Sequence, residues 1–307
     1  MTEPYVVVIG GANMDLHAQA ITDLIPGSSS PGSSQLSPGG VGRNVAEVIA
    51  RLGSPCHLIA AVGDDPLGAE LIAHTADAGV DVTHVRQRPV HTGTYAAILS
   101  PSGELVVAVS DMAATDLVTP LVIEAAAGVI REAAAIILDG NLLPASIEHA
   151  LGMAREADRR VIIDPVSVPK AERLRPLLGP GIDLISPNRD ELAALTGMPT
   201  RTDDQIDAAI AALHELGIRG VWVRLGQDGS IFSGDGNGRV RHHVVESPVV
   251  DVTGAGDAML GAYCHALLQG ASHHEAVRYG HAAATLTVGS RSTVRPDLSD
   301  ELIRSLL

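Results

Sequence analysis

Short apolar segments that alternate with helical patterns constrain the fold of this 307-residue chain more than any other feature. Each apolar run is long enough for one strand, and a segment with helical periodicity follows most of them. Strands that are buried on both faces and joined by helices are typical of a parallel sheet. We expect strands at residues 6–9, 57–62, 136–138, 161–164, 184–186 and 220–225, and helices at 43–52, 66–79, 146–157, 189–195, 203–216, 254–270 and 274–288. The pattern predicts a three-layer α/β/α fold with a central, mostly parallel sheet, in a single domain over residues 1–307.

Two segments interrupt this alternation. Residues 16–37 are rich in Ser, Gly and Pro, and residues 90–112 contain two β-type runs joined by Pro101-Ser102-Gly103, which indicates a hairpin turn. Together they predict a small β-sheet that projects from the body of the protein as a lid over a substrate. An ordinary surface meander is the alternative, and the sequence does not decide between the two.

The charge and composition exclude several classes of protein. A net charge of −15 without a basic stripe opposes binding to nucleic acids and to anionic membranes. Lys170 is the only lysine, so a lysine-dependent P-loop is excluded. Apolar runs are too short to cross a bilayer and no secretory signal is visible, which predicts a cytoplasmic protein. Cys56 and Cys264 lack metal-site spacing and are expected to be buried free thiols.

The loop Asp251-Val252-Thr253-Gly254-Ala255-Gly256-Asp257 carries the strongest chemical signal. It opens a helix, where unpaired backbone N–H groups and the helix dipole attract an anion, and its glycines let a phosphate approach the backbone. A carboxylate beside an anion site suits a base that takes a proton from a hydroxyl during phosphoryl transfer. For Asp257 alone, the alternative is an ordinary helix N-cap.

Polar and glycine-rich loops also follow the first strands. Asn13 and Asp15 come just after the first predicted strand, while Gly40 and Asn44 lie where the first helix opens. Because parallel strands gather their carboxyl ends at one edge of a sheet, these side chains are placed to meet a ligand, with Asp15 as an acceptor for sugar hydroxyls. A local Asx turn is the alternative for the first pair.

A second pair of polar residues follows a later strand. Asn188 and Glu191 are three residues apart and share one face of the first turn of a helix. Glu191 could hold a hydrated Mg²⁺ through water, and a capping box between the two residues is the alternative. The next strand ends in a glycine turn, Leu225-Gly226-Gln227-Asp228-Gly229, that is suited to lie against a nucleotide.

The order of these motifs resembles that of the ribokinase-like (PfkB-type) sugar and nucleoside kinases, and the resemblance covers essentially the whole chain. It implies the ribokinase-like fold and transfer of the γ-phosphoryl group of ATP to an alcohol, with Mg²⁺. Asp257 would be the base, and the backbone N–H groups of Gly254, Ala255 and Gly256 would hold the transferring phosphate. A non-catalytic nucleoside-binding sensor that keeps the fold is the alternative from another class.

The resemblance also assigns the binding residues. Asn188 and Glu191 would organise Mg²⁺ and the ATP phosphates, and the adenosine site would be lined by Arg224, Gly226, Gly229, His281 and Ala284. Asp251 and Thr253 match in part the position of a monovalent cation such as K⁺ in this family. The oligomeric state is left open, with a homodimer that pairs through the lid as one alternative.

The acceptor is expected to be the 5′-hydroxyl of a ribose in a nucleoside. The motifs resemble most those of the family members that phosphorylate pseudouridine; ribokinase, fructokinase and other nucleoside kinases are the alternatives. Asp15, Gly40 and Asn44 would bind the ribose hydroxyls, and the base would be faced by Asn13, Thr94, Asp111 and Asn141. Since aromatic residues are scarce, hydrogen bonds would read the base, and Asp111 or Asn141 could accept from the additional N–H of a C-linked base.

Overall fold

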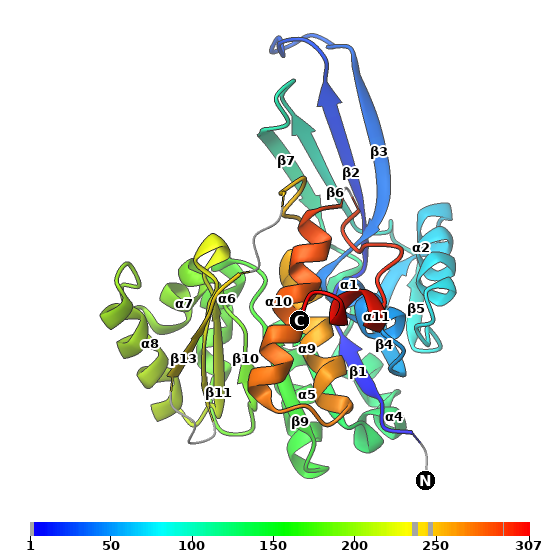
Figure 1. The fold of residues 1–307 in the computed structure, drawn as a ribbon. Coiled ribbons are helices and arrows are strands. Elements are labelled where there is room, and N and C mark those ends of the chain that lie inside the picture. Colours follow the sequence, from blue (N-terminus) through cyan, green and yellow to red (C-terminus); the bar gives the residue numbers. More distant parts are fainter. Residues whose placement is uncertain (1–2, 235–238, 245–247, 291) are drawn as a thin grey trace.

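The computed structural model describes residues 3–234, 239–244, 248–290 and 292–307. Within these ranges a nine-stranded sheet forms the centre of the protein, and a four-stranded sheet projects from it (Figure 1). The strands of the large sheet, in spatial order, are β13 (Arg239–His242), β12 (Ser230–Gly234), β11 (Gly220–Arg224), β10 (Leu184–Ile185), β9 (Arg160–Asp164), β8 (Ala135–Asp139), β1 (Val6–Ile9), β4 (Cys56–Gly63) and β5 (Val85–Arg88).

The large sheet is parallel from β11 to β5, and β12 and β13 add to one edge in antiparallel pairing. All six predicted strands are present, which confirms the predicted mostly parallel sheet. Sequence periodicity predicted no strand at β5, β12 or β13. The edge strands β5 and β13 carry polar residues such as Arg86 and Arg239, so they lack the continuous apolar run of a strand buried on both faces. Strand β12 lies between β11 and β13, and only Ile231 and Phe232 of its five residues are apolar.

Helices cover both faces of the large sheet, as predicted. The helices of one face include α1 (Val41–Arg51), α2 (Pro66–Asp77), α9 (Ala255–Leu268), α10 (His273–Val288) and α11 (Asp300–Arg304). The other face holds α3 (Pro120–Glu124), α4 (Ala127–Glu132), α5 (Pro144–Glu156), α6 (Val168–Leu174), α7 (Arg189–Thr196) and α8 (Asp203–Glu215). The sequence analysis assigned no helix at α3, α4, α6 or α11, each of which has seven residues or fewer.

Strand β1 shows how the core is built in two halves. Val7 and Ile9 belong to the apolar cluster on one face of the sheet, and Val6 and Val8 belong to the cluster on the other. All four side chains are fully buried, because successive residues of a strand point to opposite faces. Burying each such side chain contributes roughly 1.5–3 kcal/mol relative to exposure, so both helical layers anchor the strand that leads to the first polar loop.

The four-stranded sheet stands away from the helical body (Figure 1). Its spatial order is β3 (Gly32–Gly39), β2 (Asn13–Ala20), β6 (Thr94–Leu99) and β7 (Leu105–Asp111). The β6–β7 pair is the predicted antiparallel hairpin, whereas β2 and β6 pair in parallel. The sheet therefore starts at Asn13, three residues before the predicted lid segment, and carries the first polar loop into the lid. We call these four strands the lid.

Candidate active site

A cleft of about 1210 Å³ lies between the lid and the carboxyl ends of the parallel strands. The residues lining it include His17 and Tyr95 from the lid, Lys170 from α6, and Thr293 near the C-terminus. Many of the predicted site residues line the same cleft, namely Asn13, Asp15, Gly40, Asn44, Asn141, Asp251, Thr253, Gly254 and Asp257. Segments far apart in the sequence meet here because parallel strands place their carboxyl ends at one edge of the sheet.

Asp257 lies in the first turn of α9 and is 9% exposed. The N-cap of this helix is Gly254, whose left-handed φ of 78° a glycine adopts without strain, and Asp257 is the third helical residue. The alternative that Asp257 caps the helix is therefore wrong. Its carboxylate instead accepts a hydrogen bond of 2.8 Å from Nδ2 of Asn44.

The surroundings of Asp257 raise its pKa from 3.8 to about 7, mainly because burial disfavours the charged carboxylate. The hydrogen bond from Asn44 and the charge of Arg224 act in the opposite direction, while Asp164 and Asp139 add to the increase. A carboxyl group with a pKa near neutrality can both take up and release a proton under physiological conditions. The site thus places a carboxyl group suited to general-base chemistry next to a helix N-terminus.

A buried chain of polar side chains fixes the amide of Asn44. Arg43 forms an ion pair of 2.7 Å with Glu47, and both side chains are 1% exposed. Nη2 of Arg43 donates to Oδ1 of Asn44 at 2.8 Å, which leaves Nδ2 of Asn44 to donate to Asp257. Asn44 was predicted to bind ribose hydroxyls; the structure places its amide against the candidate base. Sequence reasoning missed the roles of Arg43 and Glu47, although both lie next to the glycine motif.

The N-terminus of α9 is shaped to admit an anion. This helix has 14 residues, and the N–H groups of its first turn and the positive end of its dipole lie where the cleft meets the loop. A Cβ on Gly254 would clash with the carbonyl oxygen of Thr293, and a Cβ on Gly256 would clash with Nη1 of Arg224. The backbone contact and the left-handed φ therefore require glycine at position 254, whereas a side chain at position 256 would displace the Arg224 guanidinium.

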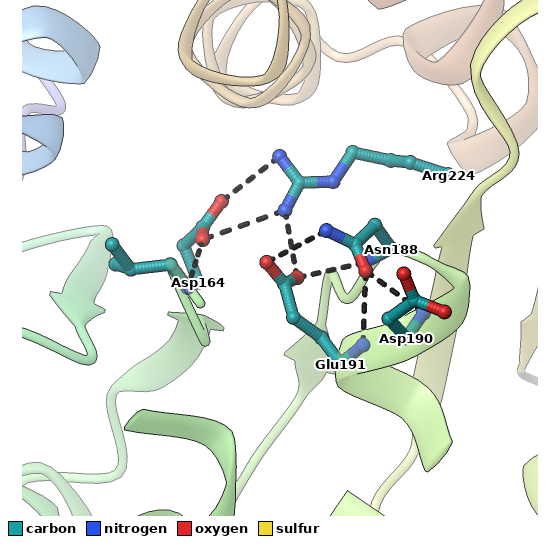
Figure 2. A network of polar contacts seen from close by, with 6 residues as sticks. Asp164, Asn188, Asp190, Glu191 and Arg224 are labelled. Carbon is teal, nitrogen blue, oxygen red and sulfur yellow. Dashed lines mark hydrogen bonds and ion pairs between the residues drawn. The ribbon is translucent and has the colours of Figure 1, made fainter. Parts of the chain in front are cut away.

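Beside this helix terminus, Arg224 lies between two buried carboxylates (Figure 2). Its Nη1 is 3.2 Å from Oδ2 of Asp164, and its Nη2 is 3.4 Å from Oε2 of Glu191. Both carboxylate side chains are 3% exposed, and burial raises the pKa of Glu191 while Arg224 opposes the increase. The predicted adenosine-site residue Arg224 thus points toward the anion-binding loop. Asp164, to which the sequence analysis gave no role, is its principal partner.

Asn188 and Glu191 form the capping box that the sequence left as an alternative (Figure 2). The backbone N–H of Asn188 donates to Oε2 of Glu191 and its Nδ2 donates to Oε1, each at 2.8 Å. This geometry holds the Glu191 carboxylate next to Asp164. Oδ2 of Asp164 is buried, and its partner among the described residues is the Arg224 guanidinium at 3.2 Å. Two adjacent buried carboxylates supply oxygen ligands of the kind that a hydrated Mg²⁺ takes.

The described residues contain no group of three or more His, Cys, Asp or Glu side chains that could hold a metal ion directly. Asp251 and Thr253, the predicted partners of a monovalent cation, form a local turn in which the Asp251 carboxylate accepts the N–H of Thr253 at 2.8 Å. Within the described residues, neither such a metal-binding group nor this turn adds a ligand to the predicted monovalent-cation site.

At the substrate side of the cleft, Asn13 donates through Nδ2 to Oδ1 of Asp15 at 2.6 Å, and both residues are buried. Burial raises the pKa of Asp15, against the hydrogen bond from Asn13. A Cβ on Gly39 would clash with the Asp15 carboxylate, and Gly40 has a φ of 95°. The glycine motif therefore makes room for an acidic side chain that could bind hydroxyl groups.

Two predicted base-facing residues do not line the cleft. Thr94 and Asp111 form one cross-strand pair in the lid, whereas the next pair, Tyr95 and Ser110, lines the cleft. Because neighbouring residues of a strand point to opposite faces, Thr94 and Asp111 belong to the other face of the lid. Predicting this from sequence would have required the register of the hairpin.

The remaining residues that were predicted for the nucleotide site lie around the antiparallel edge of the large sheet. Gly226 and Gly229 have φ values of 61° and 85° in the turn between β11 and β12, and a Cβ on Gly229 would clash with a carbonyl oxygen of His242. His281 is buried, bonds to Ser230 at 2.7 Å and stacks on His242. Burial lowers the pKa of His281 to about 4, so the ring is neutral. Ala284 follows it on α10 and is partly buried.

None of the helices in the described residues is both long and apolar enough to span a membrane.

The chain is similar in sequence to known carbohydrate kinases. Residues 3–300 match the pfkB family of carbohydrate kinases. The chain is 31% identical to a pseudouridine kinase of Escherichia coli (99% of this chain, 96% of the relative) and 31% identical to a ribokinase of Arabidopsis thaliana (97% and 79%).

Solved structures extend the likeness to three dimensions. A carbohydrate kinase from Agrobacterium tumefaciens matches with a TM-score of 0.85 and 32% identity (99% of this chain, 96% of that chain). Ribokinase of A. thaliana, complexed with ribose and ATP, matches with a TM-score of 0.86 and 28% identity (100% and 99%). This chain therefore belongs to the PfkB family of carbohydrate kinases.

Proposed function

We propose that this kinase transfers the γ-phosphoryl group of ATP to the 5′-hydroxyl of a nucleoside, and that pseudouridine is its substrate. The observation that carries the proposal is the position of Asp257. This buried carboxyl group, with a pKa of about 7, lies in the first turn of the helix whose N-terminus faces the cleft. The 31% identity to a pseudouridine kinase over 99% of the chain supports the choice of nucleoside.

In the proposed reaction, the Asp257 carboxylate accepts the proton of the 5′-hydroxyl. The oxygen then bonds to the γ-phosphorus of ATP, the bond from that phosphorus to the bridging oxygen breaks, and ADP leaves with the electron pair. The N–H groups at the start of α9 stabilise the charge on the transferring group. Asn44 keeps Asp257 oriented, because Arg43 holds the other end of the amide.

The metal and the sugar have separate partners in the proposal. Asp164 and Glu191 would hold Mg²⁺, directly or through water, and the ion when bound would neutralise charge on the ATP phosphates. An E. coli protein of the same fold, 21% identical, was solved with ATP and Mg²⁺. Asp15 and Asn13 would bind the ribose 2′- and 3′-hydroxyls, since both are buried polar groups at the cleft.

A substrate panel tests the proposal. Steady-state phosphorylation of pseudouridine, uridine, inosine, adenosine, ribose and fructose should give the highest kcat/KM with pseudouridine. A higher value with ribose or fructose would instead establish a sugar kinase. A non-catalytic sensor is tested by the Asp257→Asn variant, which in an enzyme should keep nucleoside affinity while kcat falls roughly 10²- to 10⁴-fold.

The proposal includes a homodimer that pairs through the lid. Strand β7 is an edge strand of the lid, and Leu105, Val106, Val107 and Val109 are each more than half exposed. Exposed apolar edge strands favour pairing with another strand. Light scattering should give a dimer mass for the wild type and a monomer mass for Val107→Lys; a wild-type monomer at micromolar concentration would contradict the dimer.

A further inference from the structure

Lys170, the only lysine of the chain, lies on α6 and lines the same cleft as Asp257. Its ammonium group donates a hydrogen bond to Oδ1 of Asn141, which also lines the cleft. Burial lowers the pKa of Lys170. A partly buried lysine in a substrate cleft is unusual, because desolvating an ammonium group is costly unless a ligand or partner compensates.

The fold brings these two residues together through tightly packed loops. Gly140 lies against the carbonyl oxygen of Pro165, where a Cβ would clash, so the loops after β8 and β9 are in direct contact. Asp139 accepts the backbone N–H groups of Gly11 and Gly42, each at 2.8 Å, and thereby ties the Asn141 loop to the first strand and to α1. The Lys170–Asn141 pair is therefore built on rigid elements.

The next loop carries backbone strain at the cleft. Val166 has a left-handed φ of 70°, which is rare for a β-branched residue, and its N–H donates to Oδ1 of Asp164 at 2.8 Å. Val166 lines the cleft beside Lys170. Strain of this kind persists where the surrounding structure enforces it, often at ligand sites.

Lys170 forms no ion pair with the two carboxylates that we propose to hold Mg²⁺. Among the ion pairs of the described residues, Asp164 and Glu191 are bound by Arg224, and none within 4.0 Å involves the Lys170 ammonium. The group has three N–H donors, one of which is used by Asn141, so two remain for a ligand. Oδ1 of Asn141 faces Lys170, and the other end of the amide interacts with Asp139, whose pKa this side-chain hydrogen bond lowers. Lys170 therefore offers two hydrogen-bond donors that no hydrogen bond of the described residues uses.

We propose that Lys170, oriented by Asn141, binds a carbonyl oxygen of the nucleobase and thereby selects nucleosides over free ribose. This inference rests on the proposed nucleoside kinase function. The carbonyl oxygens of a uracil ring are neutral acceptors that ribose lacks, and a charged donor makes a strong hydrogen bond to such a group. The expectation that Asn141 accepts from the additional N–H of pseudouridine is thereby replaced, since Lys170 faces its acceptor oxygen.

The test compares Lys170→Met with wild type, using pseudouridine and ribose as acceptors and ATP affinity from calorimetry. Methionine keeps the length of the side chain and removes the ammonium group. We expect kcat/KM for pseudouridine to fall roughly 10- to 100-fold, as for loss of a charged hydrogen bond, while kcat/KM for ribose and ATP affinity stay within about twofold. Lys170→Arg, which keeps the charge, should recover part of the loss.

Arg173→Met is the matched control. Arg173 is an exposed cation on the same helix that donates to the carbonyl oxygen of Gly140 at 3.1 Å, and it does not line the cleft. Its removal should leave the ratio of pseudouridine to ribose turnover unchanged. Equal losses with both acceptors in Lys170→Met, or no loss with either, would overturn the role of Lys170. Failure of the nucleoside kinase function itself would show differently, as a wild-type preference for ribose, which would overturn both proposals.

Discussion

The pKa of Asp257 leads to a prediction that joins stability and catalysis. In the folded protein this pKa is about 7, against 3.8 for an unperturbed aspartate, a difference of about three units. At 1.36 kcal/mol per unit, the folded state disfavours the charged carboxylate by roughly 4 kcal/mol. The side chain is only 9% exposed, so solvent screening reduces this figure little.

The sign of the effect follows from proton linkage. A raised pKa means that the folded state holds the proton in the pH range from about 4 to 7, where the unfolded state has lost it. The free energy of unfolding therefore falls as the pH rises through this range, and the loss is complete above pH 7. Asp257→Asn removes the titration, so this variant should be about as stable as wild type near pH 4 and more stable at pH 8 by up to roughly 4 kcal/mol.

Urea unfolding of both proteins between pH 4 and 9, without nucleotide, measures the predicted difference. Asp204→Asn, an exposed change at the start of α8, is the control and should show no difference that grows with pH. In parallel, wild-type kcat/KM should rise tenfold per pH unit up to an apparent pKa near 7, because the base acts as the carboxylate. If Asp257→Asn were no more stable than wild type at pH 8, or if kcat/KM were flat from pH 5 to 9, the reasoning would be refuted.

Three further changes test neighbouring contacts. Asn44→Ala removes the hydrogen bond that favours the Asp257 carboxylate, so the pH–rate profile should move to higher pH by roughly one unit; an unchanged profile would contradict this role. Arg224→Met leaves two buried carboxylates unpaired and should lower the free energy of unfolding by about 3–5 kcal/mol, measured in urea, with a smaller loss in added Mg²⁺. Gly254→Ala places a Cβ against the Thr293 carbonyl at a left-handed φ, so it should lower kcat at least tenfold and reduce stability by more than about 1 kcal/mol; wild-type kinetics would show that the turn tolerates a side chain.

The order of the buried elements could be predicted from the sequence because periodicity reports burial directly. The runs around Val7, Ile137 and Val221 are apolar at every position, as required of strands covered on both faces, and all lie in the parallel sheet. The edge strands β5 and β13 escaped prediction because their exposed faces break that pattern. The short helix α6 was missed because its seven residues are too few for a helical period to be recognised in the sequence.

For the site, the sequence by itself determined which loops meet at the cleft, because parallel strands gather motifs such as 251–257 at one edge. It could not determine what each side chain contacts there. Only the tertiary structure decided that Asn44 donates to Asp257, that Arg224 points toward the anion loop, and that Lys170 is joined to Asn141. These contacts connect residues from different strands and helices, and their geometry depends on packing and strand register, which local sequence patterns do not encode.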